Sequence, residues 1–384
     1  MSPTNEISQH FETLQLHAGQ VPDPTTNASA VPIYASASFV FKKKNYFLMK
    51  NKKIELVILQ MAVLEGGIAV LATSSGVAAQ FMAIATICVA GDNIISSSYL
   101  YGGTYSQFKV TLPRLGINVK FIDGDDLEEF AKSIDEKTKA IYVETMSNSR
   151  FNIPDLEAIS KIAHDAGIPL IVDNTLGAGG YLIQPIKFDV DIVVHSSTKW
   201  IGGHGTTVGG VIIDSGKFPW NNGRFPDFTK QSPNGFSWGK FARMEVLADI
   251  GACQNPFGSF LTLQGIETLS LRVNRQAENS MKLARWLESH ELVSWVSYPG
   301  LESHAYHKNA KKYMRNGFAN IGDAKTLIIN SAISTHNRLT EEERLKTGTP
   351  IDLIRVSIGY EHIDDIKADF EQAFEKVKEA MFSD

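Results

Sequence analysis

Short apolar runs alternate with helix-like segments between about residues 61 and 255, and this alternation limits the fold more than any other feature of the sequence. A chain that repeats strand and helix in this way forms a mostly parallel sheet, with right-handed crossovers and helices on both faces. Gly91 and Gly167 follow two of the helical stretches and favour helix ends there. The sequence therefore predicts an α/β fold. The predicted strands are Ile68–Ala72, Asn93–Ser97, Val119–Ile122, Ala140–Val143, Leu170–Val172, Ile192–His195 and Gly210–Ile213, and the predicted helices include Val77–Ile87, Leu127–Ser133 and Asp155–Ala166.

The pattern changes after Pro256, where the alternation of strand and helix stops. One long amphipathic helix is predicted from Gly265 to His290, because apolar residues recur there at three- and four-residue steps. Short strands and a closing helix from Asp364 follow, a mixture typical of an α+β domain. The strands predicted in this part are Val293–Tyr298, Thr326–Asn330 and Ile354–Ser357. We predict an N-terminal arm (1–60), a large domain (61–255) and a small C-terminal domain (256–384).

The composition argues against several classes of protein. The 384 residues carry a formal net charge of −5, which gives no general attraction to nucleic acid or to anionic membranes. Only two cysteines occur, Cys88 and Cys253, and neither lies in a CxxC or Cys/His cluster, so we predict no disulfide framework and no metal site. The first residues lack the basic and apolar regions of a secretory signal. These features predict a cytoplasmic protein without nucleic-acid or membrane partners.

Two segments permit a different interpretation. Residues 66–91 contain no charged side chain, which meets the length criterion for a membrane span. The polar turn at residues 73–76 interrupts them, so we predict a buried strand, a turn and a buried helix instead. The basic residues between 42 and 53 are compatible with a nuclear-import or nucleic-acid patch. A solvated arm is the favoured interpretation of that segment.

The most informative stretch is DIVVHSSTKWIGGHG, in which an apolar strand ends at His195 and Lys199 follows. In open α/β sheets, ligands bind at this carboxyl edge of the strands. Desolvation there favours the neutral amine, which is a nucleophile for an aldehyde. Asp173 ends the preceding strand, so the two side chains can face one cavity. Pyridoxal 5′-phosphate (PLP) needs such a pair, a lysine for its aldehyde and a carboxylate that keeps its pyridine nitrogen protonated. A solvated surface lysine and an aspartate that caps a helix or turn are the alternatives.

A phosphate site is predicted where the first strand of the large domain meets a helix. The turn Thr73–Gly76 precedes that helix, and its small residues allow backbone N–H groups to point at an anion, which the helix dipole also favours. Ser196 and Thr198 can donate two further hydrogen bonds. A serine-rich helix cap without a ligand is the alternative.

Four further polar or aromatic residues suit the ring and the substrate. Tyr101, in LYGGTY, lies in a glycine-flanked turn where it can stack on a planar cofactor or simply pack. Glu144 and Asn148 follow the next strand and can reach the ring's phenolic edge or bond within their loop. Arg355, inside the strand LIRVS, suits the α-carboxylate of an amino acid, with an internal salt bridge as the alternative. The sequence contains no Walker A, HExxH or GxSxG motif, and GGHG does not follow a strand as a dinucleotide motif should.

These residues occur together with longer matching stretches, and the chain resembles the Cys/Met-metabolism group of fold-type I PLP enzymes. Within that group it is similar to the O-acetylhomoserine sulfhydrylases (homocysteine synthases). The resemblance covers most of the chain and is carried by LHAGQ, AVPIYAS, VDNT with GAGGY, HSSTKWIGGHGTT, SGKFPW, LQGIETLSLR, VSWVSYPGL, NIGDAKTL and DLIRVSIGYEHIDDI. Gly103 follows the sulfhydrylase pattern, where the otherwise similar methionine γ-lyases carry cysteine.

The resemblance implies a role for each matching residue. Lys199 would form a Schiff base with PLP and act as the catalytic base and acid, and Tyr101, the second predicted catalytic residue, would stack on the ring. Asp173 would hold the pyridine nitrogen and Arg355 the substrate carboxylate. The full set of predicted cofactor-binding residues is Ser75, Gly76, Val77, Tyr101, Asn148, Asp173, Thr175, Ser196, Thr198 and Lys199, and the predicted substrate-binding residues are Arg355 and Asn320.

The chain also departs from the family pattern. The family's Tyr-x-Arg-x-x-Asn-Pro motif, which reaches the phosphate site of a neighbouring subunit, is absent between Phe41 and Leu64. Ser149 stands where the family has proline. The chain is shortened between Ser232 and Gly251, and more so at Phe318, where the family has a strand and helix of the small domain. The loss of a buried strand is expected to expose an edge or leave a void.

The resemblance implies a reaction and an assembly. The expected reaction is γ-replacement on O-acetyl-L-homoserine with sulfide, which gives homocysteine and acetate. The alternatives are γ-elimination of methionine or cystathionine, γ-replacement with another nucleophile, and a homologue without full catalytic competence. A homodimer or homotetramer is expected, although the missing interface motif weakens that expectation.

Overall fold

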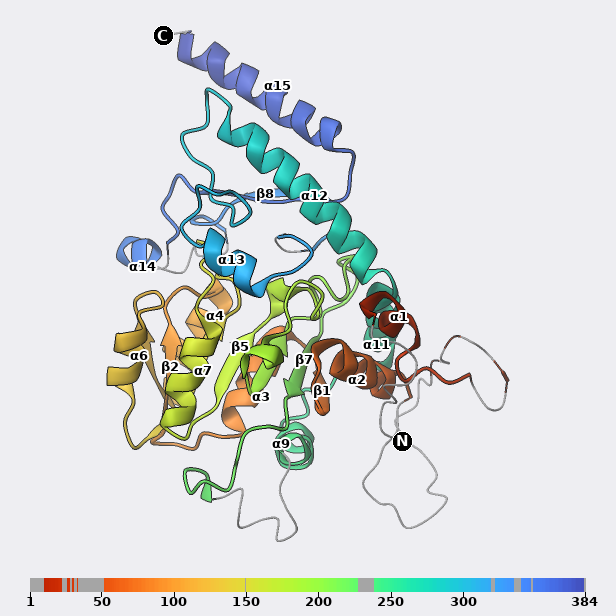
Figure 1. Ribbon diagram of the computed structural model, residues 1–384, viewed down its shortest axis with the longest axis vertical. Coiled ribbons are helices and arrows are strands. Elements are labelled where there is room, and N and C mark those ends of the chain that lie inside the picture. The colour runs from red at the N-terminus through yellow and green to blue at the C-terminus, as the bar shows by residue number, and fades with distance from the viewer. Residues whose placement is uncertain are drawn as a thin grey trace.

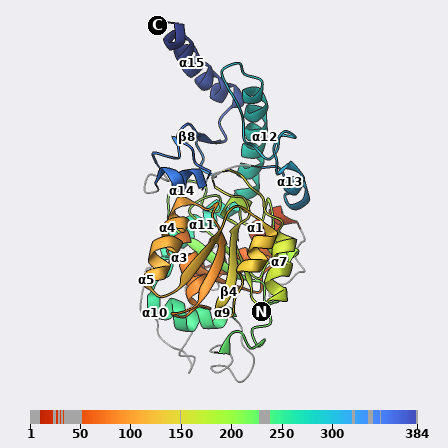
Figure 2. The ribbon, with the colours of Figure 1, turned by 90° about the vertical axis from the view of Figure 1, so that its left-hand side faces the viewer.

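A seven-stranded sheet lies between two layers of helices in the computed structural model, which describes residues 10–22, 26–27, 30, 33, 52–148, 150–226, 238–318, 322–334, 340–346 and 348–382 (Figures 1 and 2). The strand order is β1-β7-β6-β5-β4-β2-β3, and β7 runs antiparallel to both of its neighbours. The remaining pairs are parallel, as the sequence predicts. The strands are β1 (Ala69–Thr73), β2 (Asn93–Ser97), β3 (Asn118–Ile122), β4 (Thr138–Glu144), β5 (Leu170–Asp173), β6 (Ile192–His195) and β7 (Gly210–Asp214).

The helices divide between the two faces of this sheet (Figure 2). Helices α2 and α7 cover one face, and α3, α4 and η1 cover the other. The strands other than β3 are buried along nearly their whole length, so the central ones contain runs of apolar residues instead of alternating apolar and polar residues. The helices of the large domain are α1 (Phe11–His17), α2 (Lys52–Glu65), α3 (Gly76–Ala85), α4 (Gly102–Ser106), the π-helix η1 (Gln107–Thr111), α5 (Leu112–Arg114), α6 (Leu127–Ser133), α7 (Leu156–Asp165), the 3-10 helices η2 (Thr175–Gly177) and η3 (Pro185–Phe188), α9 (Trp238–Phe241), the π-helix η4 (Ala242–Leu247) and α10 (Ala248–Ile250).

The uncharged run of residues 66–91 forms β1, a turn and α3, which confirms the predicted strand, turn and helix. None of the described helices is long and apolar enough to cross a membrane. Gly91 does not end α3, because the helix already stops at Ala85. Instead its N–H group donates to Gly116 O in the turn before β2. Helix α2 begins at Lys52, inside the predicted N-terminal arm, because its apolar residues bury against β1 and β7.

The long helix predicted from Gly265 is two helices. Helix α11 (Pro256–Glu267) begins nine residues earlier than predicted, with Asn255 Oδ1 accepting from Gly258 N at 2.7 Å and proline in the first turn. The chain bends at Thr268, whose φ of −114° and ψ of 10° are not helical, and α12 (Leu269–Glu288) follows. The helix caps at Asn255 and Pro256 are visible in the sequence, and the prediction overlooked them.

The small domain has fewer strands than predicted. Among its described residues, β8 (Leu327–Asn330) and β9 (Ile354–Ser357) form the one pair of strands, in antiparallel register, and the predicted strand Val293–Tyr298 is wrong because that segment has no strand structure. Beside it lies an apolar cavity of about 470 Å³, lined by residues 292–299, Phe318 and residues 352–356. A strand requires a hydrogen-bonded neighbour, and no described strand pairs with this segment. Helices α13 (His307–Tyr313), α14 (Glu341–Lys346) and α15 (Ile363–Phe382) complete the domain, with α15 packed against α12 at the end of the molecule distant from the sheet (Figure 1).

Several features named above fall outside the described residues. These are the basic residues 42–51, Ser149, Asn320, and residues 227–237 of the shortened region.

We predict that Gly265→Ala destabilises the large domain. A Cβ at this position would collide with the carbonyl oxygens of Ile201 and Gly202, which belong to the loop after Lys199. Overpacking against backbone costs about 1–3 kcal/mol, so urea denaturation should show a free energy of unfolding lower by that amount. Phe257→Ala, an exposed position on the same helix, should change it by less than about 0.5 kcal/mol. Equal effects of the two substitutions would contradict the close packing of α11 on the loop.

Candidate active site

Three neighbouring strands end in polar residues at one edge of the sheet. Glu144 and Asp173 are direct register partners on β4 and β5, and Asp173 is in turn opposite Val194 on β6. Ile171 and Val194 pack toward the α3 layer, and since successive strand residues alternate between faces, Glu144 and Asp173 also face α3. Lys199 follows β6 in a tight turn, with its N–H group donating to Ser196 O at 3.2 Å. The carboxyl edge therefore brings together the carboxylates and the loop that carries the lysine.

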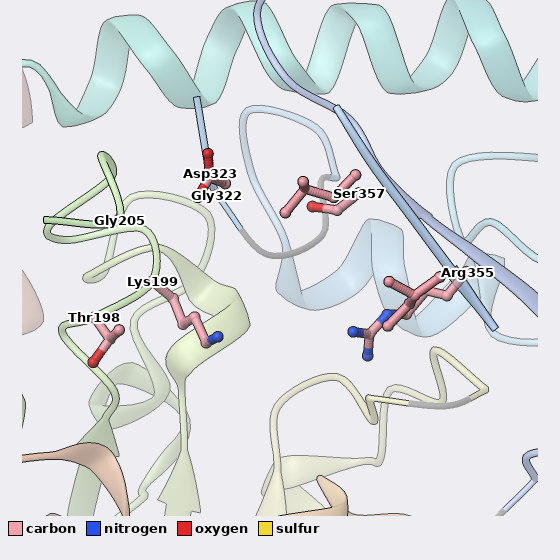
Figure 3. A pocket seen from close by; sticks show the side chains of 9 residues that line it. Thr198, Lys199, Gly205, Gly322, Asp323, Arg355 and Ser357 are labelled. Carbon is pink, nitrogen blue, oxygen red and sulfur yellow. The ribbon is translucent and has the colours of Figure 1, made fainter. Parts of the chain in front are cut away.

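Lys199 extends into a cavity of about 270 Å³ between this loop and the small domain (Figure 3). Arg355, from β9, projects into the same cavity from the opposite side, so residues far apart in sequence meet there. The lysine is half-buried. Burial lowers the pKa of Lys199, the positive charge of Arg355 lowers it further, and Asp323 acts in the opposite direction. The lining residues are Thr198, Lys199, Gly205, Gly322, Asp323, Leu327, Ile329, Arg355 and Ser357.

Asp173 is oriented by hydrogen bonds from two sides. Its Oδ1 accepts from Thr175 N at 2.8 Å, and Tyr142 OH lies 3.5 Å from its Oδ2. Burial raises the pKa of Asp173, while the hydrogen bonds from Thr175 and the charge of His195 oppose that rise. Thr175 Oγ1 also accepts from Ser196 N at 2.8 Å. One threonine therefore connects the carboxylate to the loop that carries Lys199.

The N-terminus of α3 has the properties of an anion site. Ser75 Oγ caps the helix by accepting from Ala78 N at 3.0 Å, and the N–H groups of Gly76 and Val77 have no carbonyl of the helix to bond. A Cβ at Gly76 would lie 2.6 Å from Ser196 Cβ, so only glycine permits this approach. The turn before α3 and the loop after β6 therefore meet, as a site for a phosphate requires.

Thr198 has different neighbours from those predicted. Its hydroxyl donates to Gly209 O at 3.2 Å and accepts from Gly209 N at 3.1 Å. These bonds fasten the lysine loop to Gly209, the residue before β7. Thr198 also lines the cavity into which Lys199 extends, and its contact with a phosphate stays a prediction.

Glu144 positions two loops instead of reaching the ring. Its Oε1 accepts from Tyr101 N at 2.6 Å and its Oε2 from Asn148 N at 3.1 Å. Burial and the neighbouring Asp173 raise the pKa of Glu144 well above its usual range. Tyr101 is 40% exposed, and its ring lies against Gly103, where a Cβ would be 2.5 Å from the ring carbon Cε1. The glycine-flanked turn thus leaves one face of the tyrosine accessible for stacking.

Arg355 keeps part of its hydrogen-bonding capacity. Its Nη1 donates to Asn148 Oδ1 at 2.5 Å, while its buried Nε has no partner among the described residues. In that part of the chain it also has no carboxylate at ion-pair distance, so the alternative of an internal salt bridge receives no support. Burial lowers the pKa of Arg355. A guanidinium held in this way suits a carboxylate ligand.

Two buried side chains of α12 were missed in the sequence. Arg272 Nη2 donates to Trp200 O at 3.0 Å and to Gly265 O at 2.6 Å, and Gln276 Nε2 donates to Asp323 O. They hold the backbone on both sides of the cavity around Lys199. Their spacing of four residues on the buried face of an amphipathic helix is the signal that could have identified them.

The comparisons with known proteins identify the family of the chain. The model of the family described as Cys/Met metabolism PLP-dependent enzyme matches residues 12–320 and 317–375. The chain belongs to this family. Its cofactor is PLP, and its fold is that of the fold-type I PLP enzymes.

Relatives align over nearly the whole chain. The homocysteine synthase of Schizosaccharomyces pombe is 51% identical, with 96% of this chain and 99% of that protein aligned. The O-acetyl-L-homoserine sulfhydrylase 1 of Thermus thermophilus is 43% identical, over 94% of this chain and 99% of that protein. The crystal structure of an O-acetylhomoserine (thiol)-lyase from Campylobacter jejuni, which contains N′-pyridoxyl-lysine-5′-monophosphate, superposes with a TM-score of 0.89 at 35% identity, covering 95% of this chain and 100% of that one.

The alignments also show that this chain is shorter than its relatives. The alignment with the S. pombe protein spans 423 positions, more than the 384 residues of this chain, so the relative has segments that are missing here. The family match divides into two segments that meet at residues 317–320. This is the position of the shortening at Phe318, next to the apolar cavity of the small domain.

The residues present fit PLP. The α3 N-terminus suits its phosphate, Asp173 its pyridine nitrogen and the partly desolvated Lys199 its aldehyde. When bound, PLP provides an electron sink for the bonds of a substrate amino acid. In the part of the chain that the structure describes, no group of three or more His, Cys, Asp or Glu side chains is arranged to hold a metal ion.

We predict that Arg355→Gln moves the covalent attachment of PLP to higher pH. Attachment requires the neutral amine of Lys199, and the substitution removes a positive charge that lowers the pKa of that amine. The rate of attachment to the PLP-free protein should be followed by absorbance between about pH 6 and about pH 11, a range that begins well below the ordinary titration of lysine, at about 10.4, and ends above it. Arg285→Gln, on the exposed side of α12, is the matched control. An unchanged pH midpoint in Arg355→Gln would contradict the predicted coupling.

Proposed function

We propose that the protein catalyses γ-replacement on O-acetyl-L-homoserine with sulfide, giving homocysteine and acetate. The observation that supports this most is the placement of Lys199 opposite Arg355 in one cavity at the carboxyl edge of the sheet. The names of relatives that are about half identical, homocysteine synthase among them, support the choice of reaction.

Each residue of the site has one task in this proposal. Arg355 binds the substrate α-carboxylate, with Asn148 orienting the guanidinium. Lys199 would hold the cofactor through its aldehyde, and its neutral Nζ would remove the Cα proton of the substrate. The lowered pKa of Lys199 favours this neutral form. A base of this kind must lie within hydrogen-bond reach of the proton that it removes.

The remaining steps take place at the substrate side chain. Removal of a proton from Cβ allows the Cγ–O bond to break, and acetate leaves with the bonding electron pair. Sulfide adds at Cγ, and the protons return to Cβ and Cα, with Lys199 as the donor at Cα. Tyr101 would stack on the ring of the cofactor. The carboxylate of Asp173 would bind the protonated ring nitrogen.

The assembly and location of the enzyme are part of the proposal. We infer a homodimer or homotetramer in the cytoplasm. Cys88 and Cys253 are both free thiols, which suits a reducing compartment. The shortening of the chain in the small domain leaves the sheet of the large domain complete, so the surfaces of that domain remain for association.

We predict that Lys199→Ala lowers the rate of homocysteine formation from O-acetylhomoserine and sulfide by at least about a hundredfold, since it removes the general base. Lys161→Ala, an exposed lysine paired with Asp165 on α7, should retain full activity. Product analysis by mass spectrometry measures both.

The same assay separates the alternatives. Formation of 2-oxobutyrate from methionine or cystathionine, without homocysteine from the proposed pair, would replace γ-replacement with γ-elimination. Product formed only with a carbon or nitrogen nucleophile would change the acceptor. No turnover of any of these substrates by a protein that binds PLP would identify a homologue that has lost catalysis.

A further inference from the structure

A second polar cluster lies behind the cofactor edge, on the opposite face of the sheet. Glu65, the last residue of α2, and His195, the last residue of β6, have fully buried side chains, and His195 Nε2 donates to Glu65 Oε1 at 2.6 Å. A buried charge requires a partner, so the two groups depend on each other. The reaction proposed above gives neither residue a task.

Hydrogen bonds extend this pair across three strands. Asn174 Nδ2 donates to Glu65 Oε1 at 2.9 Å, and Thr145 Oγ1 donates to Asn174 Oδ1 at 2.8 Å. The chain Thr145–Asn174–Glu65–His195 thus connects the ends of β4, β5 and β6. We call it the rear network.

Each member of the rear network that comes from a strand end is the sequence neighbour of a residue at the cofactor edge. Thr145 follows Glu144, Asn174 follows Asp173, and His195 precedes Ser196. Successive residues of a strand point to opposite faces, so the network lies on the α2 face while Asp173 points toward α3. A shift of one network residue would therefore move a residue of the site.

Fold stability alone does not account for the pair. Glu65 Oε2 and His195 Nδ1 are buried, and neither has a hydrogen-bond partner in the described part of the chain. Buried polar atoms are normally paired, and replacing a buried ion pair by apolar residues of similar volume is often neutral or stabilising. A pair that retains two unpaired polar atoms is better explained by its effect on a residue of the site.

That residue is Asp173. Burial raises the pKa of Asp173, and the adjacent carboxylate of Glu144 is a like charge, whereas His195 acts in the opposite direction. The other titratable group that contacts Asp173 is Tyr142, at 3.5 Å. His195 is thus the group of the rear network that acts on this carboxylate, and its hydrogen bond to Glu65 Oε1 fixes the position of its ring.

We propose that the His195–Glu65 pair is a positioning device for Asp173, which holds the end of β5 in place through Asn174 so that this carboxylate points at the pyridine nitrogen of PLP. The inference rests on the proposed role of Asp173 and adds two positioning residues to it. It is a statement about cofactor binding and is independent of which nucleophile the enzyme accepts.

A double-mutant cycle on PLP affinity tests the proposal. His195→Gln, Asp173→Asn and the double variant are prepared without cofactor, and PLP is titrated by fluorescence quenching. His195→Gln should weaken binding by about tenfold, the size of a lost interaction with a charged group, and should have no further effect in the Asp173→Asn background. Glu65→Gln, which leaves the histidine without its counter-charge, should weaken binding in the same direction. Additive effects of His195→Gln and Asp173→Asn would overturn the proposal, because a purely structural role does not depend on the carboxylate.

The chain contains a matched control at the other end of the same strand. His164 Nε2 lies 2.8 Å from Asp191 Oδ2, and Asp191 directly precedes β6. Asp191→Asn should lower the melting temperature and leave PLP affinity unchanged. Loss of affinity in this variant as large as in His195→Gln would also overturn the proposal, since any damage to β6 would then suffice.

Two further results would show whether the proposed role of Asp173 or the positioning role of His195 and Glu65 is wrong. If Asp173→Asn alone leaves PLP affinity unchanged, the proposed role of Asp173 is wrong. If Asp173→Asn weakens binding and neither His195→Gln nor Glu65→Gln does, the site stands and the positioning role is wrong. Circular dichroism identifies variants that do not fold, and Glu65→Gln keeps the test decisive if His195→Gln is one of them.

Discussion

The parallel register of β4, β5 and β6 is the constraint on which the site depends. It sets Glu144 beside Asp173 and places the start of the lysine loop one strand further along. Burial raises the pKa of both carboxylates, and the neighbouring Asp173 raises that of Glu144 further, while hydrogen bonds from Thr175 N, Tyr101 N and Asn148 N oppose these rises. The sheet thereby places the carboxylates at one edge, and the loops that follow its strands provide the N–H groups that orient them.

The opposite wall of the site comes from the small domain. Arg355 approaches Lys199 across the cavity, and the repulsion between the two cations favours the neutral amine. Arg272 and Gln276 of α12 hold the backbone around this meeting point. The position of α12 relative to the sheet therefore affects the chemistry at Lys199, although α12 itself contributes no group to the cavity lining.

The strands of the large domain could be predicted to within one or two residues, because strands buried on both faces leave continuous apolar runs in the sequence. The predicted strand at Val293–Tyr298 was wrong, since an apolar pattern does not show whether a segment finds a hydrogen-bonded neighbour, and no described strand pairs with this one. Gly265–His290 was predicted as one helix because periodicity does not register a bend such as that at Thr268. The residues of the site also fall into those that the sequence could identify and those that it could not. Residues in short motifs, such as Lys199 and Gly76, could be identified from the sequence. Arg272 and Gln276 were overlooked although their four-residue spacing on α12 was visible, whereas Glu65 acts through contacts with distant segments, which no local pattern reveals.

The central claim is that the ε-amine of Lys199 is the group that binds the cofactor aldehyde. Reduction of the PLP-loaded protein with borohydride, followed by proteolysis and mass spectrometry, tests it directly. The account predicts a pyridoxyl group on the peptide that contains Lys199 and on no other lysine. A protein that binds PLP and is labelled elsewhere, or is not labelled, would contradict it.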